Sequence, residues 1–198
     1  MSVPSKKFKK TYSPQSSGDD EVIPGIIEVI HLKNFMCHSN LRFEFGPHLN
    51  FITGQNGSGK SAVLAAVVIG LGAKASSMSR YASAKEYIKN DCNAAEISVI
   101  LSNAGSDAFE PETFGRKIVV ERKISKAGGG SYKMKSESGN VVYEKRDHLT
   151  RMLQHFNIQL ENPVTMLTQD VSRQFLQSMK PNRLYDVCLV VNLLPLTV

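Results

Sequence analysis

A glycine-rich stretch at residues 54–61, with the spacing Gly-x-x-x-x-Gly-Lys-Ser, carries the most specific chemical signal in this sequence. Glycine has no Cβ, so the backbone can adopt positive φ and curl until consecutive N–H groups point at one centre. A lysine at the end of such a loop reaches the β- and γ-phosphates of a nucleotide, and the next hydroxyl ligates Mg²⁺. The spacing therefore predicts a nucleotide polyphosphate site. The residues expected to form it are Gly54, Gln55, Asn56, Gly57, Ser58, Gly59, Lys60, Ser61 and Ala62.

Such a loop binds phosphate when it lies between a strand that precedes it and a helix that follows it. The apolar run at residues 49–53 predicts that strand, and residues 58–71 predict the helix. The helix N-terminus offers unpaired N–H groups and partial positive charge to phosphate. Because this helix is apolar on nearly every side, we expect it to be packed against sheet. A glycine turn that binds nothing is the alternative, and the strand, the helix and the Lys-Ser pair together argue against it.

Further elements around this unit predict an α/β fold that contains an antiparallel meander. Three consecutive glycines at 128–130 are a hairpin signal, and residues 145–156 have helical spacing of apolar side chains. Residues 73–90 predict a loop with a short helix. Strands are expected at 26–32, 41–45, 94–101, 117–124, 131–135, 141–143 and 164–168.

Two groups of polar residues outside the loop are further candidates for function. Gln169 follows the last predicted strand, at the end where open α/β sheets place ligand-contacting groups. An exposed amide at a strand end is the equally open alternative. Basic side chains in residues 73–90, among them Arg80 and Lys85, fit either a nucleic-acid contact or a solvated loop.

The composition is that of an ordinary folded domain, with 41% hydrophobic and 21% charged residues in 198. No apolar run reaches the roughly 20 residues that span a bilayer, and the N-terminus has no signal-peptide pattern, so we expect no membrane association and a cytosolic or nuclear location. A net charge of +6 weakly favours a polyanion partner such as DNA.

Several other chemistries are not expected. The three cysteines are widely separated and form no Cys-x-x-Cys pair, which is typical of reduced thiols. The five histidines lack metal-ligand spacing, so a zinc site is not predicted. Glu110 and Glu112 flank Pro111 in a predicted loop, which argues against paired-carboxylate catalysis.

Three parts are expected along the chain. Residues 1–24 are polar and predict a disordered tail whose lysine cluster could serve nuclear import or DNA contact, or could simply be solvated. Residues 25–178 form the folded unit. Residues 179–198 are apolar towards their end and follow none of these patterns.

The order of these motifs resembles the N-terminal half of the ATPase head of the SMC (structural maintenance of chromosomes) family. A strand and a Lys33-Asn34-Phe35 turn come first, the Asn-Gly-Ser-Gly-Lys-Ser loop follows, and a later strand ends at Gln169, the Q-loop. The resemblance covers about residues 25 to 179. The runs that carry it are residues 31–38, 54–64, 155–159, 162–164, 167–169 and 174–178.

The resemblance implies an ABC-type P-loop ATPase half-head that uses ATP and Mg²⁺. It implies that Lys60 and Gln169 act in catalysis, that Ser61 and Gln169 hold Mg²⁺, and that Arg80 contacts ATP or DNA. Lys33 and Asn34 would flank the nucleotide. Many related heads carry a basic residue after the Asn-Phe pair, where this chain has Met36.

The resemblance also implies a role and partners. SMC heads sandwich each ATP between two heads, and full-length members contain a long coiled coil. We expect DNA, a partner SMC subunit and non-SMC subunits as partners, in the nucleus and on chromosomes. The expected role is chromosome maintenance and DNA double-strand-break repair by homologous recombination.

No apolar strand ending in Asp-Glu (Walker B) and no Leu-Ser-Gly-Gly signature is visible, and the family carries both far downstream. The expectation is a truncated product that binds nucleotide but does not hydrolyse ATP alone. The alternatives are the half-head of a related ABC-type repair ATPase, a non-catalytic isoform, or a complete P-loop kinase or GTPase. A complete kinase would need a second carboxylate for Mg²⁺, and a GTPase would show an Asn-Lys-x-Asp motif. Neither is found in this sequence.

Overall fold

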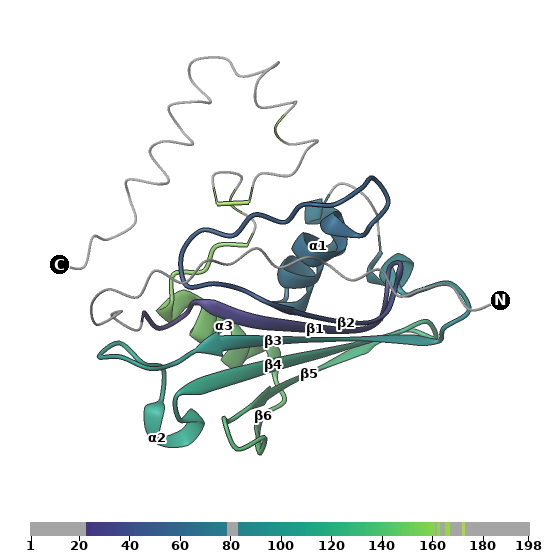
Figure 1. Ribbon diagram of the computed structural model, residues 1–198. Coiled ribbons are helices and arrows are strands. Elements are labelled where there is room, and N and C mark those ends of the chain that lie inside the picture. The colour runs from purple at the N-terminus through teal and green to yellow at the C-terminus, as the bar shows by residue number, and fades with distance from the viewer. Residues whose placement is uncertain (1–22, 79–82, 161, 163–164, 167–171, 173–198) are drawn as a thin grey trace, which may run out of the picture.

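The computed structural model describes residues 23–78, 83–160, 162, 165–166 and 172. It is built on a six-stranded sheet of order β2-β1-β3-β4-β5-β6, in which all neighbouring strands run antiparallel. Figure 1 shows this sheet as one twisted layer beneath α1. The strands are β1 (Ile27–Phe35), β2 (His38–Glu44), β3 (Ala94–Ser102), β4 (Lys117–Ser125), β5 (Gly130–Lys135) and β6 (Val141–Tyr143).

The predicted meander is confirmed, because β3, β4, β5 and β6 pair in chain order. Alternation along the strands decides which face is buried. Ile97 and Val99 point to one face and are fully buried, while Glu96 and Ser98 point to the other. An antiparallel sheet with one packed face and one solvated face produces this pattern.

Two helices, α1 (Lys60–Gly70) and α3 (Arg146–His155), cover the buried face (Figure 1). A Cβ at Gly70 would lie 2.7 Å from Cγ2 of Ile97, so glycine lets α1 approach the sheet closely. Leu149 and Met152 turn from α3 into the same core, as their spacing predicts. Burial of α1 is confirmed on its sheet side, whereas Leu64 on its outer side is 38% exposed.

Short helical turns fill the connections. They are η1 (Ala75–Met78) and η2 (Ala84–Tyr87), within the predicted loop of residues 73–90, and α2 (Pro111–Phe114). Tyr87 and Phe114 anchor η2 and α2 because both side chains are fully buried in the core. No helix in the described ranges is long and apolar enough to cross a bilayer.

The strand predicted at residues 49–53 is wrong. These residues belong to no strand, and the side chains of Leu49 and Phe51 are 77% and 81% exposed. Strand backbone needs neighbouring N–H and C=O groups. None of the described strands pairs with this segment, so its apolar pattern has no sheet to join.

Other boundaries also differ from prediction, and β2 begins at His38 rather than at residue 41. β1 continues through Lys33 and Asn34, where a turn was predicted, because Phe35 is buried and still pairs with His38. At residues 164–168 a strand was predicted, but the N–H groups of Thr165 and Met166 both donate to Asn162 O, at 3.1 Å and 2.9 Å, as in a turn. The rest of that segment, residues 1–22 of the tail predicted at 1–24, and the tail predicted at 179–198 lie outside the described residues.

Candidate functional site

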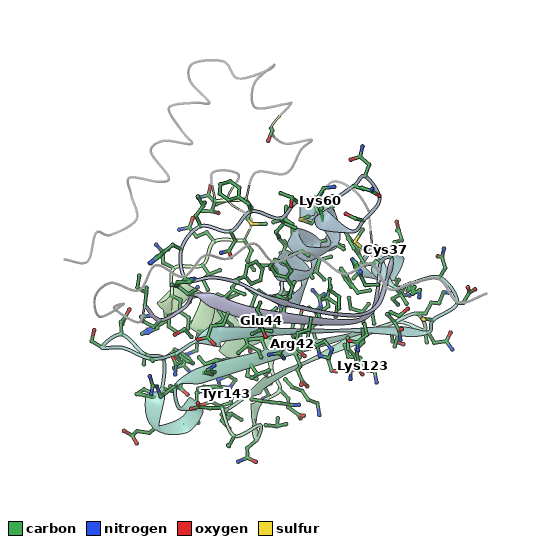
Figure 2. All side chains as sticks on the ribbon, viewed as in Figure 1. Cys37, Arg42, Glu44, Lys60, Lys123 and Tyr143 are labelled. Carbon is green, nitrogen blue, oxygen red and sulfur yellow. The ribbon has the colours of Figure 1, made fainter. Side chains whose placement is uncertain are left out.

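The phosphate loop closes around its own lysine. Lys60 Nζ donates to Gly54 O at 2.6 Å and to Gln55 O at 2.9 Å. Gly57 and Gly59 hold φ values of 78° and 95°, so the curl expected from the glycines is present. Figure 2 shows Lys60 at the end of α1 from which the loop departs. The ammonium group therefore lies against the loop backbone, within reach of a ligand that the loop would hold.

The loop fits an anionic ligand. The Ser58 Oγ is buried and has no hydrogen-bond partner within the part of the chain that the structure describes. Gly59 gives α1 no side-chain cap, and the first turn of α1 contains no acidic residue. Uncapped N–H groups at a helix start and an orphaned hydroxyl are donors that phosphate oxygens would satisfy. Lys60 would supply the cation, and the exposed Ser61 hydroxyl would be an oxygen ligand for Mg²⁺.

The tip of the β1–β2 hairpin lies against this loop, a contact that sequence reasoning missed. A Cβ on Gly59 would lie 2.1 Å from His38 Nε2 and 2.9 Å from Cys37 Sγ. Figure 2 shows Cys37 at the same end of α1 as Lys60. The resemblance of residues 31–38 to a nucleotide-flanking segment was the only sequence signal that pointed here. Both the positive φ and the close hairpin require glycine at position 59.

Of the two flanking residues predicted in this segment, the structure does not bring Lys33 to the loop. Strand alternation sends Lys33 to the solvated face, where its Nζ lies 3.5 Å from Glu96 Oε2. Asn34 stands at the start of the hairpin tip with a φ of 52°, and its carbonyl accepts from Lys89 N–H at 2.9 Å. A nucleotide contact from either residue stays a prediction, and the geometry favours the hairpin tip over Lys33.

The other predicted residues are spread out. Ala62 is fully buried under the first turn of α1. Lys85 is exposed on η2, with its Nζ 3.7 Å from the position of a Cβ on Gly128, so it lies by the β4–β5 hairpin. Arg80 and Gln169 lie outside the described residues.

Charge on the solvated sheet face is mixed rather than uniformly basic. Lys33 and Lys123 both lie near Glu96, with Nζ–Oε distances of 3.5 Å and 3.8 Å, and Lys135 Nζ lies 2.7 Å from Glu121 Oε1. Alternating signs of this kind neutralise one another locally.

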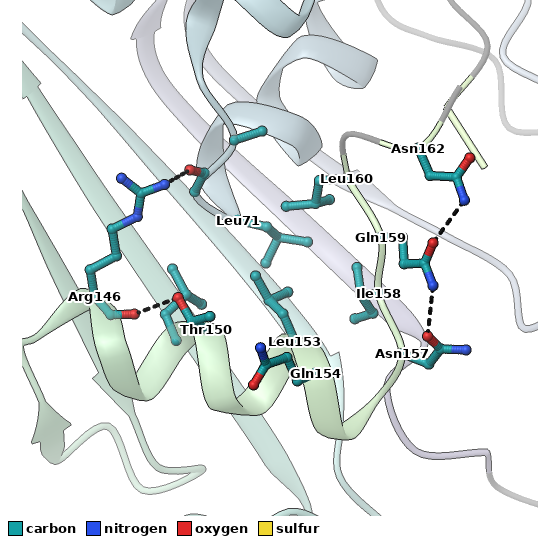
Figure 3. A pocket seen from close by; sticks show the side chains of 13 residues that line it. Leu71, Arg146, Thr150, Leu153, Gln154, Asn157, Ile158, Gln159, Leu160 and Asn162 are labelled. Atoms are coloured by element: carbon teal, nitrogen blue, oxygen red, sulfur yellow. Dashed lines mark hydrogen bonds between the residues drawn. The ribbon is translucent and has the colours of Figure 1, made fainter. Parts of the chain in front are cut away.

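A hollow of about 530 Å³ lies at the opposite end of α1 from the loop (Figure 3). Arg146 Nη2 donates to Gly72 O at 2.8 Å on one side of it. On the other side, the amides of Asn157, Gln159 and Asn162 form a hydrogen-bonded chain with distances of 3.0 Å and 2.7 Å. Its apolar lining comes from Leu71, Leu149, Leu153, Ile158 and Leu160.

Of the two carboxylates that were judged unsuited to paired catalysis, Glu110 has other partners. Tyr143 donates to Glu110 Oε2 at 2.9 Å, and this bond raises the pKa of Tyr143. Arg151 Nη2 lies 3.8 Å from Glu110 Oε1. Among the described residues, no group of three His, Cys, Asp or Glu side chains could hold a metal ion.

Comparison with known proteins identifies the family. The profile of a family described as an AAA domain matches residues 30–187. Human structural maintenance of chromosomes protein 6 is 52% identical over 155 residues, which are 78% of this chain and 14% of that protein. The Schizosaccharomyces pombe protein of the same name is 44% identical over 180 residues, 91% of this chain and 16% of that protein. The chain thus spans 14% to 16% of the length of these curated relatives.

Solved structures agree on the fold. A chain from a study of ATP-driven dimerization and DNA-stimulated activation of SMC ATPases has a TM-score of 0.66 at 21% identity, covering 82% of this chain and 96% of that chain. An Smc head domain with an extended coiled coil, bound to the C-terminal domain of ScpA and derived from Pyrococcus furiosus, has a TM-score of 0.62 at 23% identity. It covers 79% of this chain and 39% of that chain. The fold expected from the resemblance, a P-loop ATPase half-head with an antiparallel meander, is confirmed.

Proposed function

The chain belongs to the AAA-domain family and has the fold of an SMC ATPase head, and from this premise we propose that it is the ATP-binding N-terminal half of such a head. Similarity to structural maintenance of chromosomes protein 6 supports a role in chromosome maintenance and in double-strand-break repair by homologous recombination. The proposed partners are DNA, the other SMC subunit of the Smc5–Smc6 complex and its non-SMC subunits. The proposed location is the nucleus, on chromosomes.

One observation carries the nucleotide-binding part of the proposal: the curled loop with Lys60 inside it and an uncapped helix behind it. Lys60 Nζ lies 2.6 Å and 2.9 Å from two loop carbonyls, and α1 begins without a side-chain cap. Phosphate oxygens would accept from Lys60 and from the loop N–H groups, because an ammonium is attracted more strongly to an anionic oxygen than to a neutral carbonyl.

The same loop is half of a site. Hydrolysis of ATP requires a carboxylate that holds Mg²⁺ and a group that orients the attacking water. Residues 45–85, which contain the loop and α1, include no Asp or Glu. Ser61 and Gln169 are the Mg²⁺ ligands proposed from this chain, and the remaining groups would come from a later segment and from a partner head. The chain alone would therefore bind ATP without turning it over.

Exposed apolar side chains beside the loop support a covering partner. Leu49 and Phe51 are 77% and 81% exposed, and Leu64 on the outer side of α1 is 38% exposed. Figure 1 shows the segment between β2 and α1 passing over the side of α1 that faces away from the sheet. An apolar surface of this kind marks an interface. The second half of the same head would supply the strands that residues 49–53 lack.

The test is calorimetric titration of the purified chain with Mg²⁺-ATP. Lys60→Ala should abolish binding because it removes the ammonium from the loop. Lys85→Ala, which removes an exposed lysine by the β4–β5 hairpin, is the matched control and should bind normally. Equal affinity of Lys60→Ala and wild type would contradict the proposal, and so would ATP turnover by the wild-type chain that Lys60→Ala abolishes.

The flanking residues need separate variants. Lys33→Ala and Asn34→Ala in the same titration would report a nucleotide contact, and the placement of Lys33 beside Glu96 leads us to expect the smaller effect there. Gln169→Ala should weaken the Mg²⁺ dependence of binding. Arg80→Glu and Lys85→Glu should weaken DNA binding if these side chains contact the backbone phosphates.

A further inference from the structure

The C-terminal end of α1 is held by arginines from two other elements. Arg122 on β4 donates through Nη1 to Ile69 O and, at 3.4 Å, to Ala73 O. Arg146, the first residue of α3, donates through Nη2 to Gly72 O at 2.8 Å. Carbonyl groups at a helix C-terminus lack partners within the helix and carry partial negative charge. Gly72 N–H donates to Ile69 O at 3.0 Å, and the two guanidinium groups add further donors and the opposite charge.

Arg122 occupies an unusual position for a charged side chain. It lies on the buried face of the sheet, in register with Ile97 on β3 and Tyr132 on β5. Its guanidinium carbon lies 4.9 Å from the centroid of the Tyr132 ring. Burial lowers the pKa of Arg122, yet a guanidinium group remains protonated in proteins. An aliphatic side chain would fill the space between Ile97 and Tyr132 without the cost of desolvating a charge. Packing alone therefore does not explain the arginine.

The N-terminal end of α1 packs into the core through Ala62 and Val63 but shows, within the described structure, no side-chain hydrogen bond from the sheet comparable to that of Arg122. Gly59 provides no side-chain cap, and Lys60 bonds to carbonyls of its own loop rather than to the sheet. The hairpin at His38 limits movement of Gly59 from one side. An α-helix of 11 residues is a rod of about 16 Å, so what fixes its far end also sets where its first turn lies.

We propose that Arg122 is a positioning residue of the nucleotide site. By tying the last turn of α1 to β4, it sets the rotation and the axial position of the helix, and therefore the placement of Lys60 and Ser61 at the other end. The inference rests on the proposed function, because the placement of Lys60 and Ser61 affects nucleotide binding only if the loop binds phosphate. Arg122 acts through the helix and does not touch the nucleotide.

The test compares Arg122→Lys with Phe114→Leu in the full chain. Arg122→Lys keeps a positive charge but loses the planar fork that reaches two carbonyls. Phe114→Leu removes packing from a buried ring on α2 that contacts Phe109 and Tyr143, so it lowers stability without touching the end of α1. Both are measured by amide hydrogen exchange, read at Ala62 to Ala65 in the first turn of α1, and by titration with Mg²⁺-ATP.

Arg122→Lys should speed exchange in the first turn about tenfold relative to the β4–β5 hairpin, and should raise the Kd for Mg²⁺-ATP by about the same factor. Phe114→Leu should leave unchanged both the exchange rate of the first turn relative to the β4–β5 hairpin and the Kd for Mg²⁺-ATP. If the two variants give the same exchange pattern at equal loss of stability, Arg122 only stabilises the fold and the proposal is overturned. If Arg122→Lys does not fold, Tyr132→Leu, which removes the ring beneath the guanidinium, gives the same comparison. A wild-type chain that binds no ATP would refute the proposed function, while the exchange comparison would still decide the role of Arg122.

Discussion

Two regions meet at α1, and they differ in how far their apolar side chains are buried and their backbone is paired. On the sheet side, Ile97 and Val99 are fully buried, and each strand pairs with its neighbour. On the loop side, Leu49 and Phe51 are exposed and residues 49–53 join no strand. Yet the phosphate loop between these regions is already curled around Lys60.

The difference separates what local sequence can build from what needs a partner. Glycines with positive φ and one lysine set the conformation of the loop within a few residues. A strand, in contrast, requires hydrogen bonds from a neighbour that is distant in sequence. The curled conformation of the loop therefore does not depend on a sheet neighbour for residues 49–53.

The largest expected difference between the two regions is in stability. Ile97→Ala deletes a fully buried side chain between the sheet and α1, and should lower the free energy of unfolding by about 2–5 kcal/mol. Leu49→Ala deletes an exposed one and should change it by about 0.5 kcal/mol or less. Urea denaturation measures both. A large loss for Leu49→Ala would mean that the loop side is packed in solution, and the comparison would fail.

The two ends of α1 should respond differently to an added methyl group. Gly70→Ala places a Cβ 2.7 Å from Cγ2 of Ile97, and should cost about 1–3 kcal/mol of unfolding free energy by overpacking. Gly59→Ala adds a Cβ at a φ of 95° and against His38, so it should abolish ATP binding and cost about 1–2 kcal/mol. Gly57→Ala meets no atom within 4 Å and isolates the effect of positive φ. Thermal denaturation and ATP titration distinguish the three.

The exposed apolar patch should bind a hydrophobic dye. Replacing both Leu49 and Phe51 by Ser should reduce the fluorescence of bound anilinonaphthalene sulfonate while leaving the unfolding free energy within about 0.5 kcal/mol. Val141→Ser, at a half-exposed position on the edge strand β6, is the control. Unchanged fluorescence in the double variant would indicate that another surface binds the dye.

The smallest effect concerns alkaline pH on the sheet side. Burial raises the pKa of Tyr132 above its usual value of about 10, so the folded state favours the neutral phenol. This contribution to stability is complete below about pH 10 and is lost as the pH rises through the folded-state value. Tyr132→Phe should therefore make stability fall less steeply above pH 10, as followed by urea denaturation at several pH values. A profile identical to wild type would show that Tyr132 is as solvated as a residue on the loop side.

Most of the sheet could be predicted from the sequence because its strands alternate between buried and solvated positions. The alternation of Ile97 and Val99 with Glu96 and Ser98 gave β3, and the consecutive glycines 128–130 gave the β4–β5 hairpin. The same reasoning failed at residues 49–53, where the apolar pattern describes a strand that needs neighbours absent from the described sheet.

The loop itself could be predicted from spacing, but its surroundings could not. The contact of Gly59 with Cys37 and His38 joins segments about twenty residues apart, and no local pattern encodes it. Arg122 is one of three consecutive charged residues, Glu-Arg-Lys, and only the register of β4 places it on the buried face. Contacts of this kind depend on tertiary packing, which periodicity does not specify.

The hydrogen bonds from Lys60 to the carbonyls of Gly54 and Gln55 make the loop a competitor of its own ligand. An incoming triphosphate would have to exchange these bonds for its own, so the apparent affinity is reduced in proportion as the ammonium spends less time released from the loop carbonyls. A change that weakens the internal bonds would tighten binding without adding any contact to the nucleotide. Occupancy of the site would then depend on a conformational equilibrium of eight residues as well as on the nucleotide concentration.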